Sequence, residues 1–337
     1  MTDPLLSAQD LRVTFTLRRA GDMPWTKPRL LHAVSGVNFD LYPGETLGVV
    51  GESGCGKSTL ARALIQMVPA TGKAIWQGKT DLLSLTSREM LKYRADIQMV
   101  FQDPLASLNP RMTVGQIIAE PLRTHKPDLG DGEVKMKIKA MMDRVGLLPN
   151  QINRYPHEFS GGQCQRIGIA RALIVEPKLL ICDEPVSALD VSIQAQVINL
   201  LVELQRDLGL AMIFIAHDLS VVKHISDRVM VLYLGREMEM AASHDLYADP
   251  QHPYTQALLS AVPIPDPVAE RAKVMIPLDG DLPSPLSPPS GCVFRTRCPR
   301  AEARCAEVVP ELSAGAHGVS CHFPGPLLNP RKVIERA

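Results

Sequence analysis

Residues 51–58 read Gly-Glu-Ser-Gly-Cys-Gly-Lys-Ser and match the pattern G-x-x-x-x-G-K-[ST] of a phosphate-binding loop. Glycine lacks a Cβ, so the backbone can wrap closely around phosphate oxygens with its amide groups directed at the anion. The apolar run 46–50 predicts a strand before the loop, and residues 58–67 predict a helix after it. A chance glycine-rich turn does not require this strand–loop–helix order, so we expect a nucleotide site here.

The last two residues of the loop have specific tasks in such a site. Lys57 supplies a positive charge to the β- and γ-phosphates, and Ser58 offers its hydroxyl to Mg²⁺. Glu52 and Cys55 occupy variable positions of the pattern, so no side-chain role is expected of them. The residues expected to contact the nucleotide or its Mg²⁺ here are Gly51, Ser53, Gly54, Cys55, Gly56, Lys57, Ser58 and Thr59.

A second motif places two acids at the end of an apolar run. Residues 178–182 predict a buried parallel strand, and Asp183 and Glu184 follow it. A buried carboxylate is costly without a partner, and nucleotide-bound Mg²⁺ is the natural partner for Asp183. Glu184 can then orient or deprotonate the attacking water. The alternative is a solvated acidic turn, which the upstream phosphate loop disfavours; together the motifs predict a nucleoside triphosphatase.

Further apolar runs extend the predicted α/β core. Residues 211–215 and 229–233 predict two more buried strands, which alternate with helical segments along the chain. Nearer the N-terminus, residues 11–15 and 33–39 alternate apolar and polar positions and predict strands. The charged stretch 18–29 between them suits an exposed hairpin loop.

Composition and charge disfavour several classes of protein. Lys plus Arg and Asp plus Glu each total 36, so the formal net charge is zero, and no nucleic-acid partner is expected. The N-terminus shows no basic region followed by a long apolar stretch, so no secretory signal is expected. No apolar run approaches the ~18 residues that a membrane span needs. Other chains would have to supply any spans.

The chain divides by composition. We expect a nucleotide-binding domain over residues 1–262, with a helical part at about 103–175. The proline-rich stretch 263–290 shows little periodicity and predicts a linker or irregular arm. A cysteine-containing segment is expected at 291–325, followed by a loose tail at 326–337.

A third motif indicates the family. Residues 159–163 read Phe-Ser-Gly-Gly-Gln and closely resemble the signature motif of ATP-binding-cassette (ABC) ATPases. Phe15 resembles the aromatic residue that stacks on adenine in that family. Gln102 resembles the glutamine of its Q-loop, Asp190 the aspartate of its D-loop, and His217 its switch histidine. The resemblance covers about residues 8–260 and implies a P-loop NTPase fold with a RecA-like core, an antiparallel β-subdomain and a helical subdomain.

The resemblance also implies how two such ATPases work together. They would meet head to tail, with ATP and Mg²⁺ held between the phosphate loop of one and the signature of the other. Asp190 would lie across this interface. The residues implied to face the γ-phosphate of the opposite site are Ser160, Gly161, Gly162 and Gln163.

The implied catalytic residues are Glu184, Gln102 and His217. Gln102 would contact Mg²⁺ or water and report the nucleotide state to a membrane subunit. His217 would hydrogen-bond the γ-phosphate and stabilise the transition state. With Ser58 and Asp183, Gln102 completes the implied Mg²⁺ ligands.

Three other stretches narrow the resemblance to the peptide-importer branch. They are Asn-Pro-Arg at 109–111, His-Pro-Tyr-Thr at 252–255 and Gly-Cys-Val-Phe-Arg-Thr-Arg-Cys at 291–298, and they are most similar to the second ATPase subunit of such permeases. The resemblance implies a peripheral protein on the cytoplasmic face of the inner membrane that powers uptake of di- and oligopeptides. Its partners would be a second ATPase, either a copy or a paralogue, two transmembrane permease subunits and an extracytoplasmic substrate-binding protein. Nickel, glutathione or antimicrobial peptides are the alternative cargoes.

Seven cysteines occur, and four of them lie near the C-terminus. In a chain without an export signal such a cluster predicts a metal site more readily than disulfides. Similar proteins of the peptide-importer branch carry an iron–sulfur cluster there, so the resemblance implies a [4Fe–4S] cluster, with zinc or unmetallated thiols as alternatives. Its expected role is to clamp the tail, without being needed for hydrolysis. The four residues are Cys292, Cys298, Cys305 and Cys321.

Two other functions remain to be weighed. A soluble cassette ATPase acting in DNA repair or at ribosomes usually has two cassettes or a long coiled-coil insertion, and this sequence has neither. A regulatory module, in which the cysteines sense iron or redox state, is the second alternative.

Overall fold

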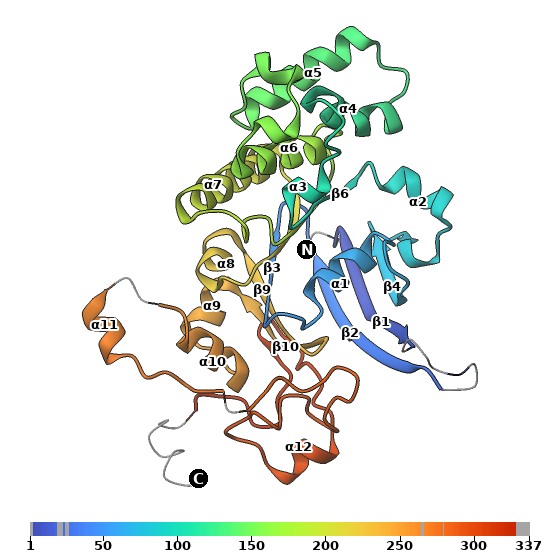
Figure 1. The fold of residues 1–337 in the computed structure, drawn as a ribbon. Coiled ribbons are helices and arrows are strands. Elements are labelled where there is room, and N and C mark those ends of the chain that lie inside the picture. The colour runs from blue at the N-terminus through green and yellow to red at the C-terminus, as the bar shows by residue number, and fades with distance from the viewer. Residues whose placement is uncertain (1–2, 19–22, 24–26, 264–265, 279, 328–337) are drawn as a thin grey trace.

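The computed structural model describes residues 3–18, 23, 27–263, 266–278 and 280–327. In these residues the chain forms two sheets (Figure 1). The larger sheet has seven strands in the order β11-β10-β9-β3-β8-β7-β6. These strands are β3 (Thr46–Val50), β6 (Ile97–Val100), β7 (Leu179–Asp183), β8 (Ala211–Ile215), β9 (Arg228–Tyr233), β10 (Arg236–Ala242) and β11 (Gly318–Val319).

The centre of the larger sheet is parallel. Neighbours from β9 through β3, β8 and β7 to β6 pair in parallel. Every residue of β3, β7 and β8 is buried, as expected of strands covered on both faces. Because the carboxyl ends of parallel strands meet at one edge, the segments that follow Val50, Cys182 and Ile215 come together there.

The smaller sheet is antiparallel and lies beside α1 (Lys57–Leu64) (Figure 1). Its longest strands exceed the predicted 11–15 and 33–39. The pairing of β1 with β2 shifts register between Ala8 and Leu11, which interrupts the alternation by which a strand is recognised in sequence. Most of the predicted loop at 18–29 lies outside the described residues. The strands are β1 (Leu6–Leu17), β2 (Arg29–Leu41), β4 (Thr71–Trp76) and β5 (Thr80–Asp81).

Helices α4, α5 and α6 gather at the end of the molecule opposite α12 (Figure 1). Two of them begin with a capping box, in which Thr113 pairs with Gln116 and Ser160 pairs with Gln163. Besides α1, the helices along the chain up to Leu208 are α2 (Ser87–Tyr93), α3 (Pro104–Ser107), α4 (Val114–His125), α5 (Asp131–Arg144), α6 (Gly161–Leu173) and α7 (Val191–Leu208), with 3₁₀ turns at Leu82–Ser84, Pro149–Asn153 and Pro156–Glu158.

The C-terminal segment packs onto the larger sheet. Strand β11 pairs antiparallel with β10, and the ring of Phe294 lies 5.3 Å from those of both Tyr233 and Tyr254. Cys292, Phe294 and Cys305 therefore belong to the same hydrophobic cluster as the strands of the core. The remaining helices are α8 (Leu219–Ile225), α9 (Ser243–Ala248), α10 (Pro253–Ser260), α11 (Pro267–Ala272) and α12 (Ala303–Glu307).

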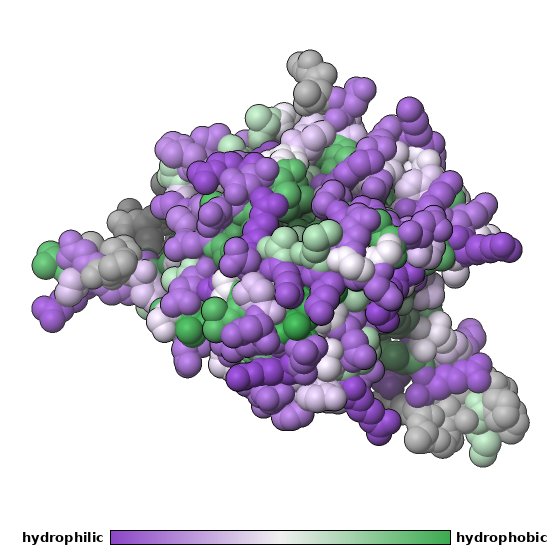
Figure 2. All heavy atoms as spheres, turned by 90° about the horizontal axis from the view of Figure 1, so that it is seen from above, coloured by the Kyte–Doolittle hydropathy of each residue, from purple (hydrophilic) through white to green (hydrophobic). Residues whose placement is uncertain are grey.

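The surface is mainly hydrophilic in the view from above, where apolar side chains form small groups separated by polar ones (Figure 2). Across the described part of the chain, no helix combines the length and the apolar character that crossing a membrane requires.

Candidate nucleotide site

The phosphate loop connects β3 to α1 and depends on glycine at two positions. Gly51 has φ 150°, and a Cβ added there would lie 2.1 Å from the carbonyl oxygen of Leu232. Gly56 has φ 107°, and its Cβ would lie 2.2 Å from the carbonyl oxygen of Ala33. Real Cβ contacts are never this short, so the path of the loop requires glycine at both positions.

A cavity of about 280 Å³ opens at this loop. It is lined by residues from the loop, from the ends of β7 and β8, and from the smaller sheet. Of the predicted residues, it is lined by Phe15, Ser53, Gly54, Gly56, Lys57, Ser58, Thr59, Gln102, Glu184 and His217. It is also lined by residues that the sequence did not indicate, namely Leu31, His32, Ala33, Leu234, Gly235 and Pro285.

Two of the predicted catalytic side chains contact the third, Glu184, in the cavity. His217 Nε2 lies 2.5 Å from one carboxylate oxygen of Glu184, and Gln102 Nε2 donates to the other at 2.7 Å. The Glu184 side chain is 7% exposed, so it is shielded from bulk water on most sides. Its backbone has φ 48°, a left-handed conformation that non-glycine residues adopt at a cost, often at functional sites.

Asp183 lies beneath the loop and is fully buried. Its Oδ1 accepts a hydrogen bond from Ser58 Oγ at 2.6 Å, whereas its Oδ2 accepts no hydrogen bond. Arg62 is 3.6 Å from Oδ2, a contact that no sequence motif indicated. A buried carboxylate oxygen without a hydrogen-bond donor fits a cation, so Ser58 and Asp183 are suited to hold Mg²⁺.

Lys57 is buried against the loop backbone. Its Nζ donates to the carbonyl oxygens of Gly51 at 2.8 Å and of Glu52 at 3.1 Å. Cys55 is buried beside it, and burial raises the pKa of its thiol. Cys55 can therefore contribute backbone groups to a nucleotide, but its thiol is protonated at neutral pH and unreactive.

The signature and D-loop residues lie elsewhere. Ser160, Gly161 and Asp190 are exposed and do not line the cavity, and neither do Gly162 and Gln163. Ser160 Oγ accepts the backbone N–H of Gln163 at 3.3 Å, which fixes the start of α6. This chain therefore carries a phosphate loop and a signature at separate places on its surface.

The four C-terminal cysteines are all free thiols. Cys292 and Cys305 are buried, and Cys298 and Cys321 are partly buried. Burial is the main cause of the raised pKa of Cys298, which is about 12, with the neighbouring Cys321, Cys292 and Cys305 adding smaller effects. In the described ranges no three His, Cys, Asp or Glu side chains are placed to hold a metal ion. The geometry therefore gives no support to the predicted cluster.

The fold and the nucleotide site together define a P-loop ATPase of the ABC class. Residues 34–187 match the family model "ABC transporter", and residues 238–305 match "Oligopeptide/dipeptide transporter, C-terminal region". The oligopeptide transport ATP-binding protein OppF of Salmonella typhimurium is 64% identical over 96% of this chain and 97% of its own. OppF of Escherichia coli is 63% identical over the same shares. The chain belongs to the oligopeptide-transport ATP-binding proteins of the ABC transporter family.

Solved structures agree with this assignment. The structure of cbiO1 from Clostridium perfringens, part of an ABC transporter complex, has a TM-score of 0.61 and 28% identity, covering 73% of this chain and 91% of that chain. A dimeric structure of the ABC transporter cassette MJ0796 has a TM-score of 0.62 and 25% identity, covering 71% of this chain and 98% of that chain. The predicted fold, family and ATPase class are thus confirmed.

Proposed function

We propose that this ABC ATPase powers the uptake of di- and oligopeptides from the cytoplasmic face of the inner membrane. Its partners are a second ATPase, two transmembrane permease subunits and an extracytoplasmic substrate-binding protein. The contact of Gln102 and His217 with Glu184, beside the phosphate loop, carries the ATPase part of the proposal. The match of residues 238–305 to the oligopeptide/dipeptide transporter region supports the cargo.

Glu184 acts on the attacking water. Its carboxylate lies at the end of β7, where the Gln102 amide and the His217 ring hold its two oxygens in place. A fixed, largely buried carboxylate can accept a hydrogen bond or a proton from water with little reorganisation. His217, 43% exposed, has room to turn its ring toward the γ-phosphate.

The phosphates lie against the loop backbone and Lys57. Phe15 lines the same cavity and provides an apolar surface for the adenine ring. Ser58, Asp183 and Gln102 would hold Mg²⁺, which would supply positive charge to the β- and γ-phosphates. Nucleotide recognition thus uses backbone amides, one lysine and one aromatic side chain.

The signature of this chain serves the partner's nucleotide. Because Ser160, Gly161 and Asp190 are exposed and do not line the cavity, they are available to a second cassette. The backbone amides at the start of α6, fixed by the Ser160–Gln163 capping box, suit an anionic phosphate. We therefore assign Ser160, Gly161, Gly162, Gln163 and Asp190 to the interface between two ATPases.

Reconstitution of the complete transporter in vesicles tests this function. ATP-dependent uptake of a labelled tripeptide is expected, with none when ATP is omitted from the compartment that holds the ATPases. Competing glutathione and nickel distinguish the alternative cargoes, and selective uptake of either one would replace the peptide assignment. Absence of any ATP hydrolysis by the complex would contradict the ATPase role itself.

We also propose that Cys292, Cys298, Cys305 and Cys321 hold a [4Fe–4S] cluster, with zinc as the alternative. Backbone N–H groups of Phe294, Arg300 and Phe323 face the sulfurs of three of these cysteines and lower their pKa values against the effect of burial. Such donors favour thiolates, the form that binds metal. The test is iron, sulfide and zinc analysis of protein purified without oxygen; no metal above trace levels would leave the thiols unmetallated.

A further inference from the structure

Two stretches that mark the peptide-importer branch do not line the nucleotide cavity. They are His-Pro-Tyr-Thr at 252–255 and the cysteine-containing stretch 291–298. In the structure both reach the same residue, Glu52, the second residue of the phosphate loop. The sequence assigned no role to Glu52 because its position in the loop pattern is variable, but in the structure its backbone and its carboxylate both contact residues that are distant in sequence.

Arg297, next to Cys298, pairs with the carboxylate of Glu52. Its Nη1 lies 2.9 Å from each carboxylate oxygen. The Arg297 side chain is 9% exposed and that of Glu52 25%, so the pair is largely shielded from water. Charge-assisted hydrogen bonds in such surroundings are stronger than surface pairs, and removing one partner leaves the other charge buried.

Tyr254 holds the backbone of the same residue. Its hydroxyl accepts the N–H of Glu52 at 3.0 Å, and its ring is fully buried. The ring packs against Tyr233 of β9, at 4.8 Å between centroids, and against Phe294 of the cysteine segment, at 5.3 Å. The hydroxyl is therefore fixed by core packing that includes the cysteine segment.

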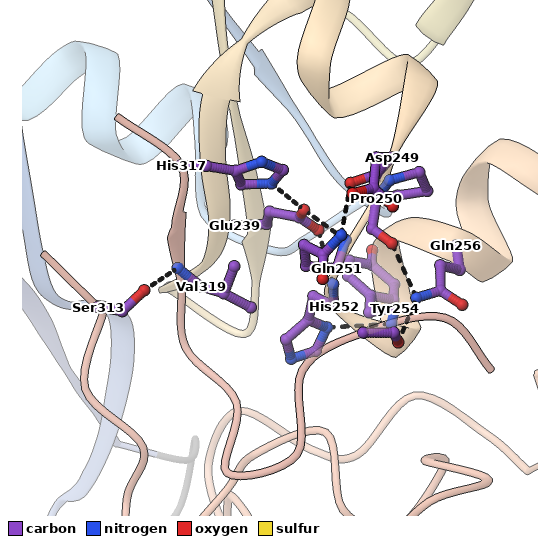
Figure 3. A network of polar contacts seen from close by, with 11 residues as sticks. Glu239, Asp249, Pro250, Gln251, His252, Tyr254, Gln256, Ser313, His317 and Val319 are labelled. Carbon is purple, nitrogen blue, oxygen red and sulfur yellow. Dashed lines mark hydrogen bonds and ion pairs between the residues drawn. The ribbon is translucent and has the colours of Figure 1, made fainter. Parts of the chain in front are cut away.

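A buried carboxylate fixes the chain just before Tyr254 (Figure 3). Glu239 of β10 accepts the backbone N–H groups of Gln251 at 2.7 Å and His252 at 2.9 Å. Its Oε1 also lies 2.6 Å from Nε2 of His317, close to β11. The start of α10 is thus joined to the C-terminal segment at Glu239 as well as at Phe294.

The backbone carbonyl group of Glu52 faces Lys57, the lysine of the phosphate loop. Its carbonyl oxygen accepts a hydrogen bond from Lys57 Nζ at 3.1 Å. Glu52 is therefore held at its N–H by Tyr254, at its carboxylate by Arg297 and at its carbonyl by Lys57. A movement of the cysteine segment would move the carbonyl that contacts Lys57.

We infer that Arg297 is a positioning residue of the phosphate loop, through which the cysteine segment sets the affinity of this chain for ATP. Arg297 does not line the nucleotide cavity and acts through Glu52. The inference rests on ATP binding at the loop, as proposed above, and does not require that the cysteines hold a metal. The expectation that hydrolysis does not need the cysteine cluster is a separate matter, because Arg297 should affect half-saturation by ATP and not kcat.

Nucleotide titration of the full-length chain with ADP and a non-hydrolysable ATP analogue tests the inference. Arg297→Met should raise the Kd about tenfold, the effect of losing a hydrogen bond to a charged group. Arg297→Lys should recover part of the affinity, because it restores the charge without the guanidinium geometry. Arg295→Met is the matched control: Arg295 lies in the same segment and its side chain hydrogen-bonds Ser290 instead of Glu52, so the Kd of this variant should change by less than about twofold.

Three further measurements test the inference. In the reconstituted transporter, Arg297→Met should raise KM for ATP while kcat stays near wild type, which a loss of folding would not produce. Glu52→Gln should weaken binding as Arg297→Met does, and the double variant should be no weaker than Arg297→Met alone. A folded Arg297→Met chain with wild-type Kd, or additive losses in the double variant, would overturn the inference.

If Arg297→Met does not fold, Glu52→Gln decides alone, and an unchanged Kd in that variant overturns the inference. If wild type and Arg295→Met both fail to bind nucleotide, the proposed nucleotide site is wrong instead. The two failures can therefore be told apart.

Discussion

The nucleotide cavity and the cysteine segment differ in how far their side chains are already placed to form a site. In the cavity, Ser58 contacts Asp183, and both Gln102 and His217 contact Glu184. In the cysteine segment, four thiols share one small region, yet no group of three in the described residues is placed to hold a metal. The packed core fixes the geometry of a site at the edge of a parallel sheet. The geometry of a site on irregular chain depends more on the ligand that it binds.

The largest effect is expected from Glu184→Gln, which tests the assembled site. Gln keeps the shape and the hydrogen bond to His217 but cannot accept a proton, so turnover should fall about 10²–10⁴-fold. ATP binding should persist, and the ATP-bound pair of cassettes should accumulate. The measurements are steady-state ATP hydrolysis by the transporter and gel filtration of the ATPases with ATP. Turnover near the wild-type rate would refute the role of Glu184 in activating water.

Cys298→Ser tests whether the stability of the cysteine segment depends on a bound metal. If it does, the free energy of unfolding should fall by about 2–3 kcal/mol, as for loss of a ligand present at about 100 times its Kd. Thermal unfolding without oxygen, together with iron and zinc content, measures this. Cys164→Ser is the control, since Cys164 is a buried thiol in α6, away from the segment. If both variants lose the same free energy of unfolding and the wild type contains no metal, the cysteine segment does not depend on a bound metal.

Gly51→Ala tests whether the backbone alone fixes the loop. The new Cβ would meet the carbonyl oxygen of Leu232 at 2.1 Å, so stability should fall by about 1–3 kcal/mol and nucleotide binding should be lost. The measurements are chemical unfolding and nucleotide titration. Gly168→Ala in α6 is the control, because a Cβ there meets nothing within 4 Å and alanine favours helix. A loop that tolerates Gly51→Ala would mean that side chains, not the backbone, decide its path.

The smallest effect concerns His252, which lies between the two regions. Burial lowers its pKa to about 3, from an ordinary value near 6.5. The unfolded chain therefore binds an extra proton below pH 6.5, and stability should fall by up to about 1.4 kcal/mol between pH 6.5 and 5.5. His252→Asn keeps an acceptor for the backbone N–H of Tyr254 and should flatten this part of the unfolding curve. Parallel curves for wild type and variant between pH 6.5 and 5 would contradict the buried neutral histidine.

Most of the nucleotide site was predictable because its residues sit in local motifs at the ends of apolar strands. Phe15, Lys57, Gln102, Glu184 and His217 all line the cavity that the structure shows. Local sequence did not reveal Arg62 opposite Asp183, or Pro285 of the proline-rich arm at the cavity wall. Neither residue follows a pattern of its own, since each reaches the site through tertiary packing.

The boundaries of the smaller sheet were predicted less well than its existence. A register shift in β1 hides the alternation on which strand recognition depends, so 11–15 was expected where Leu6–Leu17 is found. The C-terminal segment was expected to follow a linker, with its cysteines clamping the tail. The sequence did not indicate that Phe294 packs against Tyr233 and Tyr254, or that β11 extends the larger sheet.

The sequence by itself determined the class of this protein, the path of its phosphate loop and the placement of Ser58, Asp183 and Glu184 beside it, because these depend on neighbouring residues in the chain. Only the tertiary structure decided that Glu52 links the loop to Arg297 and Tyr254. Arg297 is 245 positions away in sequence, and no local pattern specifies an ion pair of that separation. Sequence patterns report periodic and contiguous features, whereas packing decides which distant side chains share a buried space.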